Sequence, residues 1–133
     1  MSLYALDTNS VSYFLKGKGH VGERLLATPP TSVGLPSVVL YELAYGAARA
    51  KAPRGLVDKL EAFLGSLRVL PFGEPEARTA ARLRLALEGA GQPIGPLDLL
   101  IAATALEQQA VLVTHNTREF ARVDGLRLED WYT

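Results

Sequence analysis

The sequence predicts an α/β fold in which a parallel sheet is flanked by helices. Short apolar runs typical of strands alternate along the chain with longer segments of helical periodicity, and this order favours a parallel sheet covered by helices. The chain has 133 residues, of which 48% are hydrophobic, enough for one core and too few for two comfortable domains. No repeat, linker or low-complexity tract divides it, so residues 1–133 are expected to form a single domain.

The N-terminal half is expected to begin with a short buried strand, "LYAL" (Leu3–Leu6). A helix over "SVSYFLKG" follows, which the glycines and lysines of Lys16–Gly19 end, and a helical piece at Val21–Ala27 is closed by the prolines behind it. Strand character returns at Thr31–Pro36. Ser37 is placed to cap the next helix, "VVLYELAYGAARAK", whose apolar residues recur at helical spacing.

The middle of the chain predicts two helices around a strand. Pro53 falls at the first turn of a helix over "RGLVDKLEAFLGSL", and Arg68–Phe72 ("RVLPF") predicts a strand cut short by its proline. "EPEARTAARLRLALEGAG" predicts a long amphipathic helix with Ala77, Ala81 and Leu85 on one stripe and arginines on the other.

The last third predicts a buried helix between strands. Pro96 ends the loop "GQPIGP" and stands where a helix begins, and "LDLLIAATALEQQ" is apolar nearly all round, which indicates a buried helix. Ala110–Thr114 is the strongest strand in the chain. "HNTREFARVDG" carries a short helix, and "LRLEDW" predicts a final strand.

Composition excludes several classes of protein. Fourteen basic and fourteen acidic residues cancel, so no global positive field marks a nucleic-acid binder, although a local patch stays open. The chain has no cysteine, which excludes disulfides and thiolate metal sites and is compatible with the cytosol. The longest apolar stretches, such as Leu97–Leu106, fall far short of the roughly 20 residues of a membrane-spanning helix. No signal-peptide pattern opens the chain, so we expect a soluble cytoplasmic protein without a membrane partner.

Four acidic residues are candidates for one site. Asp7 ends the first strand, and Glu119 lies one short turn after the strong strand near the C-terminus. Glu42 stands inside an otherwise apolar helical run, and Asp98 lies in the first turn of the apolar helix. The carboxyl ends of parallel strands share one edge of the sheet, where ligands of α/β proteins bind.

Each acidic residue also has a structural interpretation. Asp98 is favoured near a helix N-terminus by the helix dipole, and Glu42 and Glu119 can be solvated. Asp, Thr and Asn cap helices, and capping is the interpretation that we retain for Thr8 and Asn9. Asp7 differs, because a charge at the end of a buried strand is costly unless it is paired, hydrogen-bonded or bound to metal.

A metal ion explains the four carboxylates together. Carboxylates that converge without a matching lysine or arginine repel one another and raise their pKa values. A divalent cation removes that repulsion, and ligands that are all oxygen select hard ions such as Mg²⁺ or Mn²⁺. Zinc is disfavoured, because the chain has no cysteine and only two histidines, His20 and His115.

Four blocks of the sequence resemble a known family. They are "LDTN" at the end of the first strand, "YELAYGA" (Tyr41–Ala47), "IGPLDLLIAATAL" (Ile94–Leu106) and "LVTHNTREFARVDGLRLEDW" (Leu112–Trp131). In this order they resemble the PIN-domain ribonucleases, and most of all the toxin component of VapBC-type toxin–antitoxin modules. The resemblance covers nearly the whole chain. It implies a PIN-like three-layer α/β/α sandwich, with a central, mostly parallel sheet of four to five strands, in a single PIN domain over residues 1–133.

The resemblance implies a metal-dependent endoribonuclease with four acidic residues around Mg²⁺ or Mn²⁺. Asp7, Glu42 and Asp98 match the first three acidic positions, and the fourth falls on Glu119, where many relatives have Asp. These four residues are the implied catalytic and metal-binding set, with Asp7 and Asp98 as the main ligands and Glu42 and Glu119 binding metal or orienting water. The implied supporting residues are Thr8, Asn9, Thr114 and Asn116. His115 matches a variable position and receives no role.

RNA would be hydrolysed by a metal-activated water, and the resemblance implies products with 5′-phosphate and 3′-hydroxyl ends. The candidate RNA contacts are Lys16, Lys18, Arg49, Lys51, Arg54 and Arg118, although surface solubility explains any single one of them equally well. Four aromatic residues, Tyr13, Phe14, Tyr41 and Tyr45, are expected in the core or an interface.

The resemblance also implies partners. These are a cognate VapB-like, DNA-binding antitoxin whose tail enters the active-site groove, a second copy of the chain in a homodimer, and a higher oligomer with the antitoxin.

Three alternatives stay open. A haloacid-dehalogenase-type phosphotransferase also begins with a strand and Asp, but it needs a second Asp where this chain has Asn9. A non-catalytic PIN-like module would bind RNA or protein without cutting, although all four positions are acidic. A third option is a housekeeping RNA-processing nuclease or one that acts on DNA; the short length favours a toxin.

Overall fold

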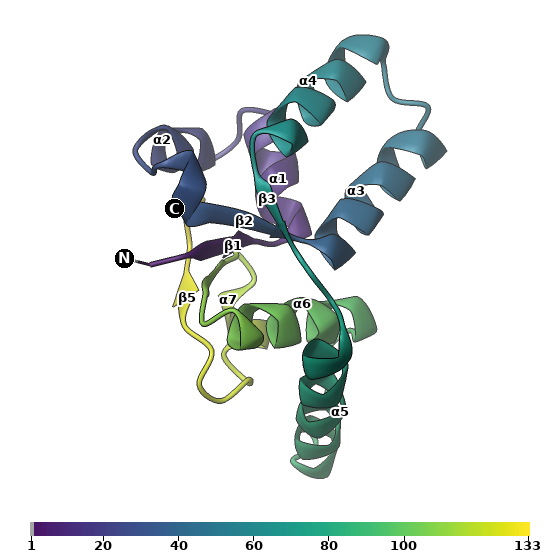
Figure 1. The fold of residues 1–133 in the computed structure, drawn as a ribbon, viewed down its shortest axis with the longest axis vertical. Helices are drawn as coiled ribbons and strands as arrows, with labels where there is room; N and C mark the ends of the chain where they lie inside the picture. Colours follow the sequence, from purple (N-terminus) through teal and green to yellow (C-terminus); the bar gives the residue numbers. More distant parts are fainter. Residues whose placement is uncertain (1) are drawn as a thin grey trace.

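Five short strands form a parallel sheet at the centre of the molecule. They are β1 (Tyr4–Leu6), β2 (Val33–Pro36), β3 (Arg68–Leu70), β4 (Val111–Val113) and β5 (Leu128–Glu129). Their order across the sheet is β3-β2-β1-β4-β5, and all four pairings are parallel. The computed structural model, which describes residues 2–133, thus confirms the α/β fold and the predicted parallel sheet (Figure 1).

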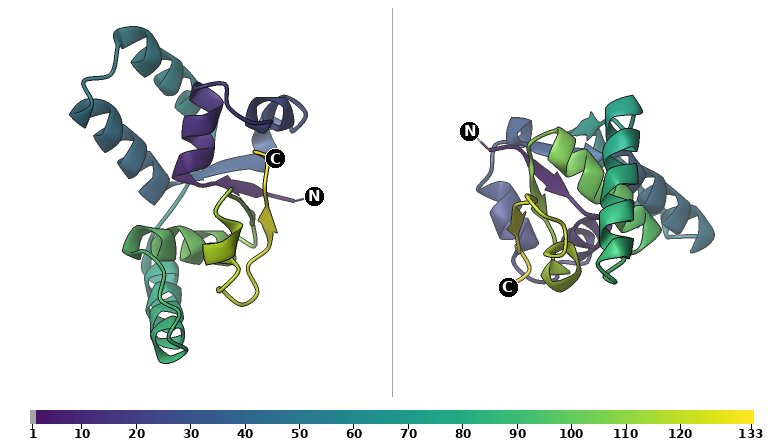
Figure 2. Two further views of the ribbon diagram at one scale, coloured as in Figure 1. Left: turned by 180° about the vertical axis from the view of Figure 1, so that it is seen from behind. Right: turned by 90° about the horizontal axis from the view of Figure 1, so that it is seen from below.

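Helices cover both faces of this sheet. They are α1 (Thr8–Leu15), α2 (Val21–Leu26), α3 (Ser37–Arg49), α4 (Arg54–Gly65), α5 (Glu74–Gly89), α6 (Pro96–Glu107) and α7 (Thr117–Phe120), with a 3₁₀ turn, η1, at Pro30–Ser32. In Figures 1 and 2, α1, α3 and α4 lie on one side of the sheet, and α5 and α6 lie on the other. The three-layer arrangement is the one expected.

Helix α6 is buried nearly all round, as its apolar sequence predicts. Leu99 and every residue from Ile101 to Ala105 are buried, and the helix packs against α3, α5 and the sheet strands β2 and β4. Such a helix is stable only inside a protein or a membrane, and here the neighbouring layers cover it. Within residues 2–133 no helix is both long and apolar enough to span a membrane.

The buried face of α5 differs from the predicted one. Ala77 and Ala81 are exposed and Leu85 is 75% exposed, whereas the buried residues are Glu76, Thr79, Ala80 and Leu87. Polar side chains face inward because each has a partner. The Thr79 hydroxyl donates to Glu107 of α6 at 2.6 Å, and the Glu76 carboxylate accepts the N–H of Gly73 at 2.7 Å. Periodicity alone therefore assigned the wrong stripe to the core.

Several element boundaries also differ from the predicted ones. Ser37 is the first residue of α3 and not its cap, since Pro36 occupies the N-cap position. Pro53 likewise precedes α4 as its N-cap. Helix α3 ends at Arg49 before Lys51, which has φ 50°. Strand β3 stops before its proline, and the segments predicted as strands at 31–36 and 126–131 shorten to Val33–Pro36 and Leu128–Glu129.

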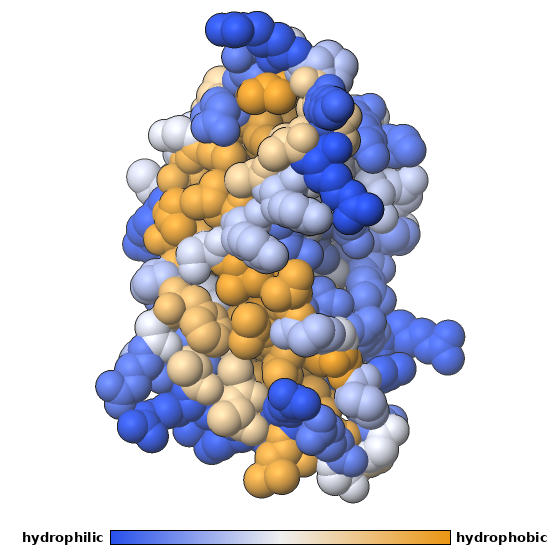
Figure 3. Space-filling model, turned by 90° about the vertical axis from the view of Figure 1, so that its right-hand side faces the viewer, coloured by the Kyte–Doolittle hydropathy of each residue, from blue (hydrophilic) through white to orange (hydrophobic). Residues whose placement is uncertain are grey.

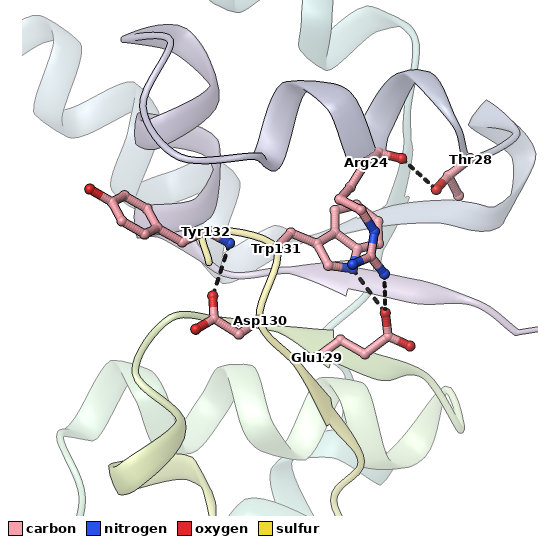
Figure 4. A network of polar contacts seen from close by, with 6 residues as sticks. All are labelled: Arg24, Thr28, Glu129, Asp130, Trp131 and Tyr132. Atoms are coloured by element: carbon pink, nitrogen blue, oxygen red, sulfur yellow. Dashed lines mark hydrogen bonds and ion pairs between the residues drawn. The ribbon is translucent and has the colours of Figure 1, made fainter.

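The C-terminal segment from Glu129 to Tyr132 contacts α2 at the edge of the sheet (Figure 4). One oxygen of Glu129 accepts hydrogen bonds from Arg24 Nη2 and from Trp131 Nε1, both at 2.9 Å. The Arg24 guanidinium also lies over the Trp131 ring, 5.3 Å from its centroid, and Trp131 is buried. Asp130 accepts the N–H of Tyr132 at 2.9 Å. These contacts join α2 to β5 and to the residues that follow it.

Candidate active site

The four predicted acidic residues all lie at the carboxyl edge of the sheet. Asp7 directly follows β1, and Glu42 lies on α3, which starts immediately after β2. Asp98 lies in the first turn of α6, and Glu119 belongs to α7, the helix after β4. The negative charges of Asp7, Glu42 and Glu119 all act on the carboxyl group of Asp98 and raise its pKa. Parallel strands therefore brought together residues from four separate segments.

Asp7 is buried and also caps a helix. Its side chain accepts the N–H of Ser10 at 2.9 Å, which makes it the N-cap of α1. The expectation that Thr8 and Asn9 are the capping residues is therefore wrong; they are the first two residues of the helix. Burial raises the pKa of Asp7, hydrogen bonds from Ser10 and Thr114 lower it, and the charge of Glu42 raises it further. Two donors thus hold one buried carboxylate in place.

Glu42 is held by a threonine from another helix. Thr8 Oγ1 donates to Glu42 Oε1 at 2.6 Å, and both side chains are half-buried. This bond joins α1 to α3, and a supporting role of Thr8 in the site stays a prediction. Asn9 is exposed, and no hydrogen bond within residues 2–133 ties its side chain to the four carboxylates.

Asp98 and Glu119 form a close acidic pair. The pKa of Asp98 is raised to about 7, first by burial and then by its hydrogen bond to Glu119 and the neighbouring charges. The pKa of Glu119 is lowered, chiefly by the N–H of Gly95. Glu119 Oε1 accepts that N–H at 3.0 Å, and Oε2 accepts Asn116 Nδ2 at 3.1 Å. Of the two carboxyl groups, Asp98 therefore takes up a proton first as the pH falls.

Thr114 and Asn116, two other residues with a predicted supporting role, contact Asp7 and Glu119 respectively. Thr114 is fully buried, and its side chain forms a hydrogen bond with Asp7. Its hydroxyl oxygen also accepts the N–H of Asn116 at 3.0 Å. Sequence reasoning missed Ser10, whose hydroxyl donates to the carbonyl of Val113 at 3.1 Å. The spacing of Asp7 and Ser10, three residues apart, was a usable capping signal.

Two further contacts carried no sequence signal. His115 Nδ1 lies 2.9 Å from Asp130 Oδ2, and Gly95 meets Glu119 across 24 positions of the chain. His20 is exposed beside Glu23.

The chemistry of these side chains suits a hard divalent cation. None of the ion pairs in the described part of the chain involves any of the four carboxylates, so the local negative charge has no salt-bridge partner. Their oxygen atoms are the ligands that such ions prefer. In the structure Glu42 accepts a hydrogen bond from Thr8, and Glu119 accepts one from Gly95. Among residues 2–133, no three acidic or histidine side chains converge closely enough to hold an ion.

The six basic residues predicted to contact RNA are all exposed. Lys16 lines a mainly apolar groove between α1, α3 and α4 whose wall also includes Thr8 and Glu42. Arg118 directly precedes Glu119. Arg49 and Arg54 flank the α3–α4 connection and Lys51 lies within it; Figure 1 shows this connection at the far end of α3 from the sheet. Lys18 lies in the loop after α1. RNA contact by these residues stays a prediction.

Tyr41 and Tyr45 on α3 are 59% and 55% exposed. Their rings stack on one another with the centroids 6.4 Å apart. Tyr13 and Phe14 are half-buried against the core. A shallow apolar depression between Val38, Tyr41, Leu97 and Leu100 lies next to this pair. Figure 3 shows a broad apolar band on that side of the molecule.

A family model described as the PIN domain matches residues 4–126. The chain belongs to the PIN-domain family. This membership removes the haloacid-dehalogenase alternative, and PIN-domain nucleases generally use divalent metal ions.

Within the PIN-domain family the chain is similar to VapC ribonucleases. It is 36% identical over 132 residues to the tRNA(fMet)-specific endonuclease VapC of Salmonella typhimurium, with 98% of this chain and 99% of that protein covered. It is 35% identical over 131 residues to Ribonuclease VapC2 of Rickettsia felis, with 97% and 98% covered. The PIN-domain chain is therefore an endoribonuclease of the VapC type.

Solved structures agree with the sequence comparison. The fold matches the DNA-bound VapBC of Salmonella typhimurium with a TM-score of 0.88 and 37% identity, over 98% of this chain and 99% of that one. It matches the promoter-bound VapBC2 of Rickettsia felis with a TM-score of 0.86 and 37% identity, over 97% and 98%. Both similarities extend over nearly the full length of the PIN domain.

Proposed function

We propose that this chain is a Mg²⁺- or Mn²⁺-dependent endoribonuclease that acts in the cytoplasm as the toxin of a type II toxin–antitoxin system. The observation that carries the proposal is the group of four carboxylates at the carboxyl edge of the sheet, which has no salt-bridge partner among residues 2–133. Similarity to VapC ribonucleases over nearly the full chain supports it.

Asp7 and Asp98 are the residues that would hold the ion, and Glu42 and Glu119 add to the negative charge of the site. When bound, the ion lowers the pKa of a water molecule and offsets charge on the leaving oxygen. Asp7 is kept rigid by Ser10 and Thr114. Glu42, which accepts a hydrogen bond from Thr8 and lines the groove, would orient the attacking water. We expect 5′-phosphate and 3′-hydroxyl ends, because the nucleophile is water and not the ribose 2′-hydroxyl.

The proposed inhibitor is a VapB-like, DNA-binding antitoxin. The VapBC complexes of Salmonella typhimurium and Rickettsia felis that resemble this chain are bound to DNA, which supports an antitoxin of that kind. The groove between α1, α3 and α4 would accept its tail, because the groove is mainly apolar and Glu42 is one of the residues that line it. An antitoxin arginine that reached the carboxylates would form charge-assisted hydrogen bonds with them and exclude the metal.

The proposed assembly is a homodimer, and a higher oligomer with the antitoxin. The apolar band of Figure 3, which stays exposed in one copy of the chain, supports the homodimer. Sedimentation of the chain alone and with its antitoxin would measure both states.

The test is cleavage of RNA by the purified protein with Mg²⁺, with Mn²⁺ and with excess EDTA. The first substrate to offer is tRNA(fMet), named for the Salmonella typhimurium relative, beside total RNA. Cleavage is expected only with a divalent ion and not with the Asp7→Asn variant. Cleavage that persists in EDTA, or in that variant, would contradict the proposal.

The runner-up is a housekeeping RNA-processing nuclease or a non-catalytic PIN-like module. An upstream neighbouring gene for a small DNA-binding protein supports the toxin, and its co-expression should abolish cleavage. A gene without such a neighbour favours the housekeeping nuclease.

A further inference from the structure

Two side chains from the C-terminal side of α7 hold the loop that leads into α6. Arg122 Nη1 donates to the carbonyl oxygen of Pro93 at 3.0 Å. Glu119 Oε1 accepts the N–H of Gly95 at 3.0 Å. One residue thus binds a carbonyl group of the loop and the other binds an N–H group. Both contacts cross more than twenty positions of the chain, so they fix two segments relative to each other.

The loop has few backbone groups that could fix it otherwise. Pro93 and Pro96 have no N–H, and residues 92–95 belong to no helix or strand. Gly95 is the N-cap of α6, and its carbonyl accepts the N–H of Leu99 at 2.9 Å. Whatever fixes Gly95 therefore fixes the start of α6, and Asp98 lies three residues further on.

The oxygen atoms of Glu119 are both engaged by donors. Oε1 takes the N–H of Gly95, and Oε2 takes the amide of Asn116 at 3.1 Å. A Cβ atom added at Gly95 would lie 3.4 Å from Asp98 Oδ2 and 3.8 Å from Glu119 Oε1. Both carboxylates therefore pack against the same piece of backbone. A shorter Asp at position 119 would withdraw its oxygen atoms from Gly95 by one methylene.

We propose that Glu119 and Arg122 are positioning residues that together clasp the Pro93–Gly95 loop and so set the place of Asp98. Glu119 acts here as a hydrogen-bond acceptor of the correct length, and its negative charge is secondary. This inference rests on the proposed function, because Asp98 is one of the residues that would hold the metal.

Two substitutions separate length from charge at position 119. Glu119→Gln keeps the side-chain length and an acceptor oxygen for the N–H of Gly95 but removes the negative charge. Glu119→Asp keeps the negative charge, but its side chain is too short to reach that N–H. Since a small displacement of a catalytic group lowers turnover strongly, we expect kcat for RNA cleavage to be about tenfold higher in Glu119→Gln than in Glu119→Asp, with similar KM. The reverse order would show that charge is what matters, as for a metal ligand, and would overturn the proposal.

Arg122 is tested with its own conservative variant. Arg122→Ala is expected to lower kcat about fivefold or more, and Arg122→Lys to recover most of the loss because its ammonium group can donate to Pro93. The matched control is Arg78→Ala, which removes an arginine whose 2.9 Å ion pair with Glu74 lies on the exposed side of α5. Equal kcat values for Arg122→Ala and Arg78→Ala would refute a role for Arg122.

A measurement without metal or RNA tests the clasp directly. Amide hydrogen exchange at Gly95, followed by NMR in EDTA, should be slow in the unsubstituted protein and in Glu119→Gln. It should be at least about tenfold faster in Glu119→Ala, which removes the acceptor. Equal exchange in the two variants overturns the clasp. If the unsubstituted protein cuts no RNA, the proposed function fails, and the exchange rates alone then decide the clasp.

Discussion

The carboxylate of Asp7 accepts the N–H of Ser10 at 2.9 Å, and the Ser10 hydroxyl donates to the carbonyl of Val113 at 3.1 Å. One residue pair therefore starts helix α1 and ties it to β4. Because Asp7 also lies among the four carboxylates, its capping bond holds a candidate metal ligand in place. The structural and the chemical interpretations of this aspartate, which compete at the level of sequence, apply together.

This dual role predicts a difference between two substitutions of Asp7. Asparagine caps helices as well as aspartate does, whereas alanine does not cap and costs about 1 kcal/mol. Both variants should lose RNA cleavage. Asp7→Ala should also melt about 4 °C below Asp7→Asn in a domain of this size. Thermal unfolding by circular dichroism measures the difference, and equal melting temperatures would argue against the cap.

Asp98 predicts a pH dependence of stability without metal. Its pKa is about 7 in the folded protein against an ordinary value of 3.8. Between these pH values the folded state holds more protons than the unfolded state, so the free energy of unfolding falls as pH rises through this window and levels off above it. The Asp98→Asn variant has no carboxyl group at this position, so it does not lose this part of the free energy of unfolding as the pH rises.

In EDTA, the melting temperature of Asp98→Asn minus that of the unsubstituted protein should therefore be larger at pH 8 than at pH 5. The increase should be about 4 °C for each kcal/mol of penalty removed. A difference that stays constant between the two pH values would contradict the raised pKa.

The bond from Thr8 to Glu42 predicts a defect in turnover. Thr8→Val keeps the shape and removes the donor that holds Glu42 Oε1 at 2.6 Å. Turnover should fall about five- to tenfold, since Glu42 can then rotate away. Thr8→Ser, which keeps the hydroxyl, should be clearly more active than Thr8→Val. Steady-state cleavage of a labelled RNA gives both values, and equal rates for the two variants would mean that this bond does not matter.

Gly34 predicts a loss of stability at the centre of the sheet. A Cβ atom there would come within 2.8 Å of the Leu70 side chain, and Gly34 pairs with both β1 and β3. Overpacking of this kind costs about 1–3 kcal/mol, so Gly34→Ala should lower the melting temperature by roughly 4–12 °C. Gly55→Ala on α4 is the control, because nothing lies within 4 Å of its added Cβ. A melting temperature of Gly34→Ala equal to that of Gly55→Ala would contradict the expected clash.

Most of the fold could be predicted because its signals are local. The apolar run after Pro96 indicated a buried helix, and α6 is one. The carboxyl-edge rule predicted that Asp7 and Glu119 lie at the same edge of the sheet. Helix α5 was assigned the wrong face because its buried positions include Glu76 and Thr79. Their inward orientation depends on partners, such as Glu107, that periodicity does not include.

The sequence by itself determined the order of strands and helices, the parallel sheet, and the residues that reach its carboxyl edge. Hydrophobic spacing and proline positions encode these properties over a few residues at a time. Only the tertiary structure decided which oxygen atom meets which donor. Thr8 bonds Glu42 across 34 positions, and Glu119 bonds Gly95 across 24. Such pairs depend on how the helical layers pack against the sheet. No local pattern in the chain specifies which residues this packing brings into contact.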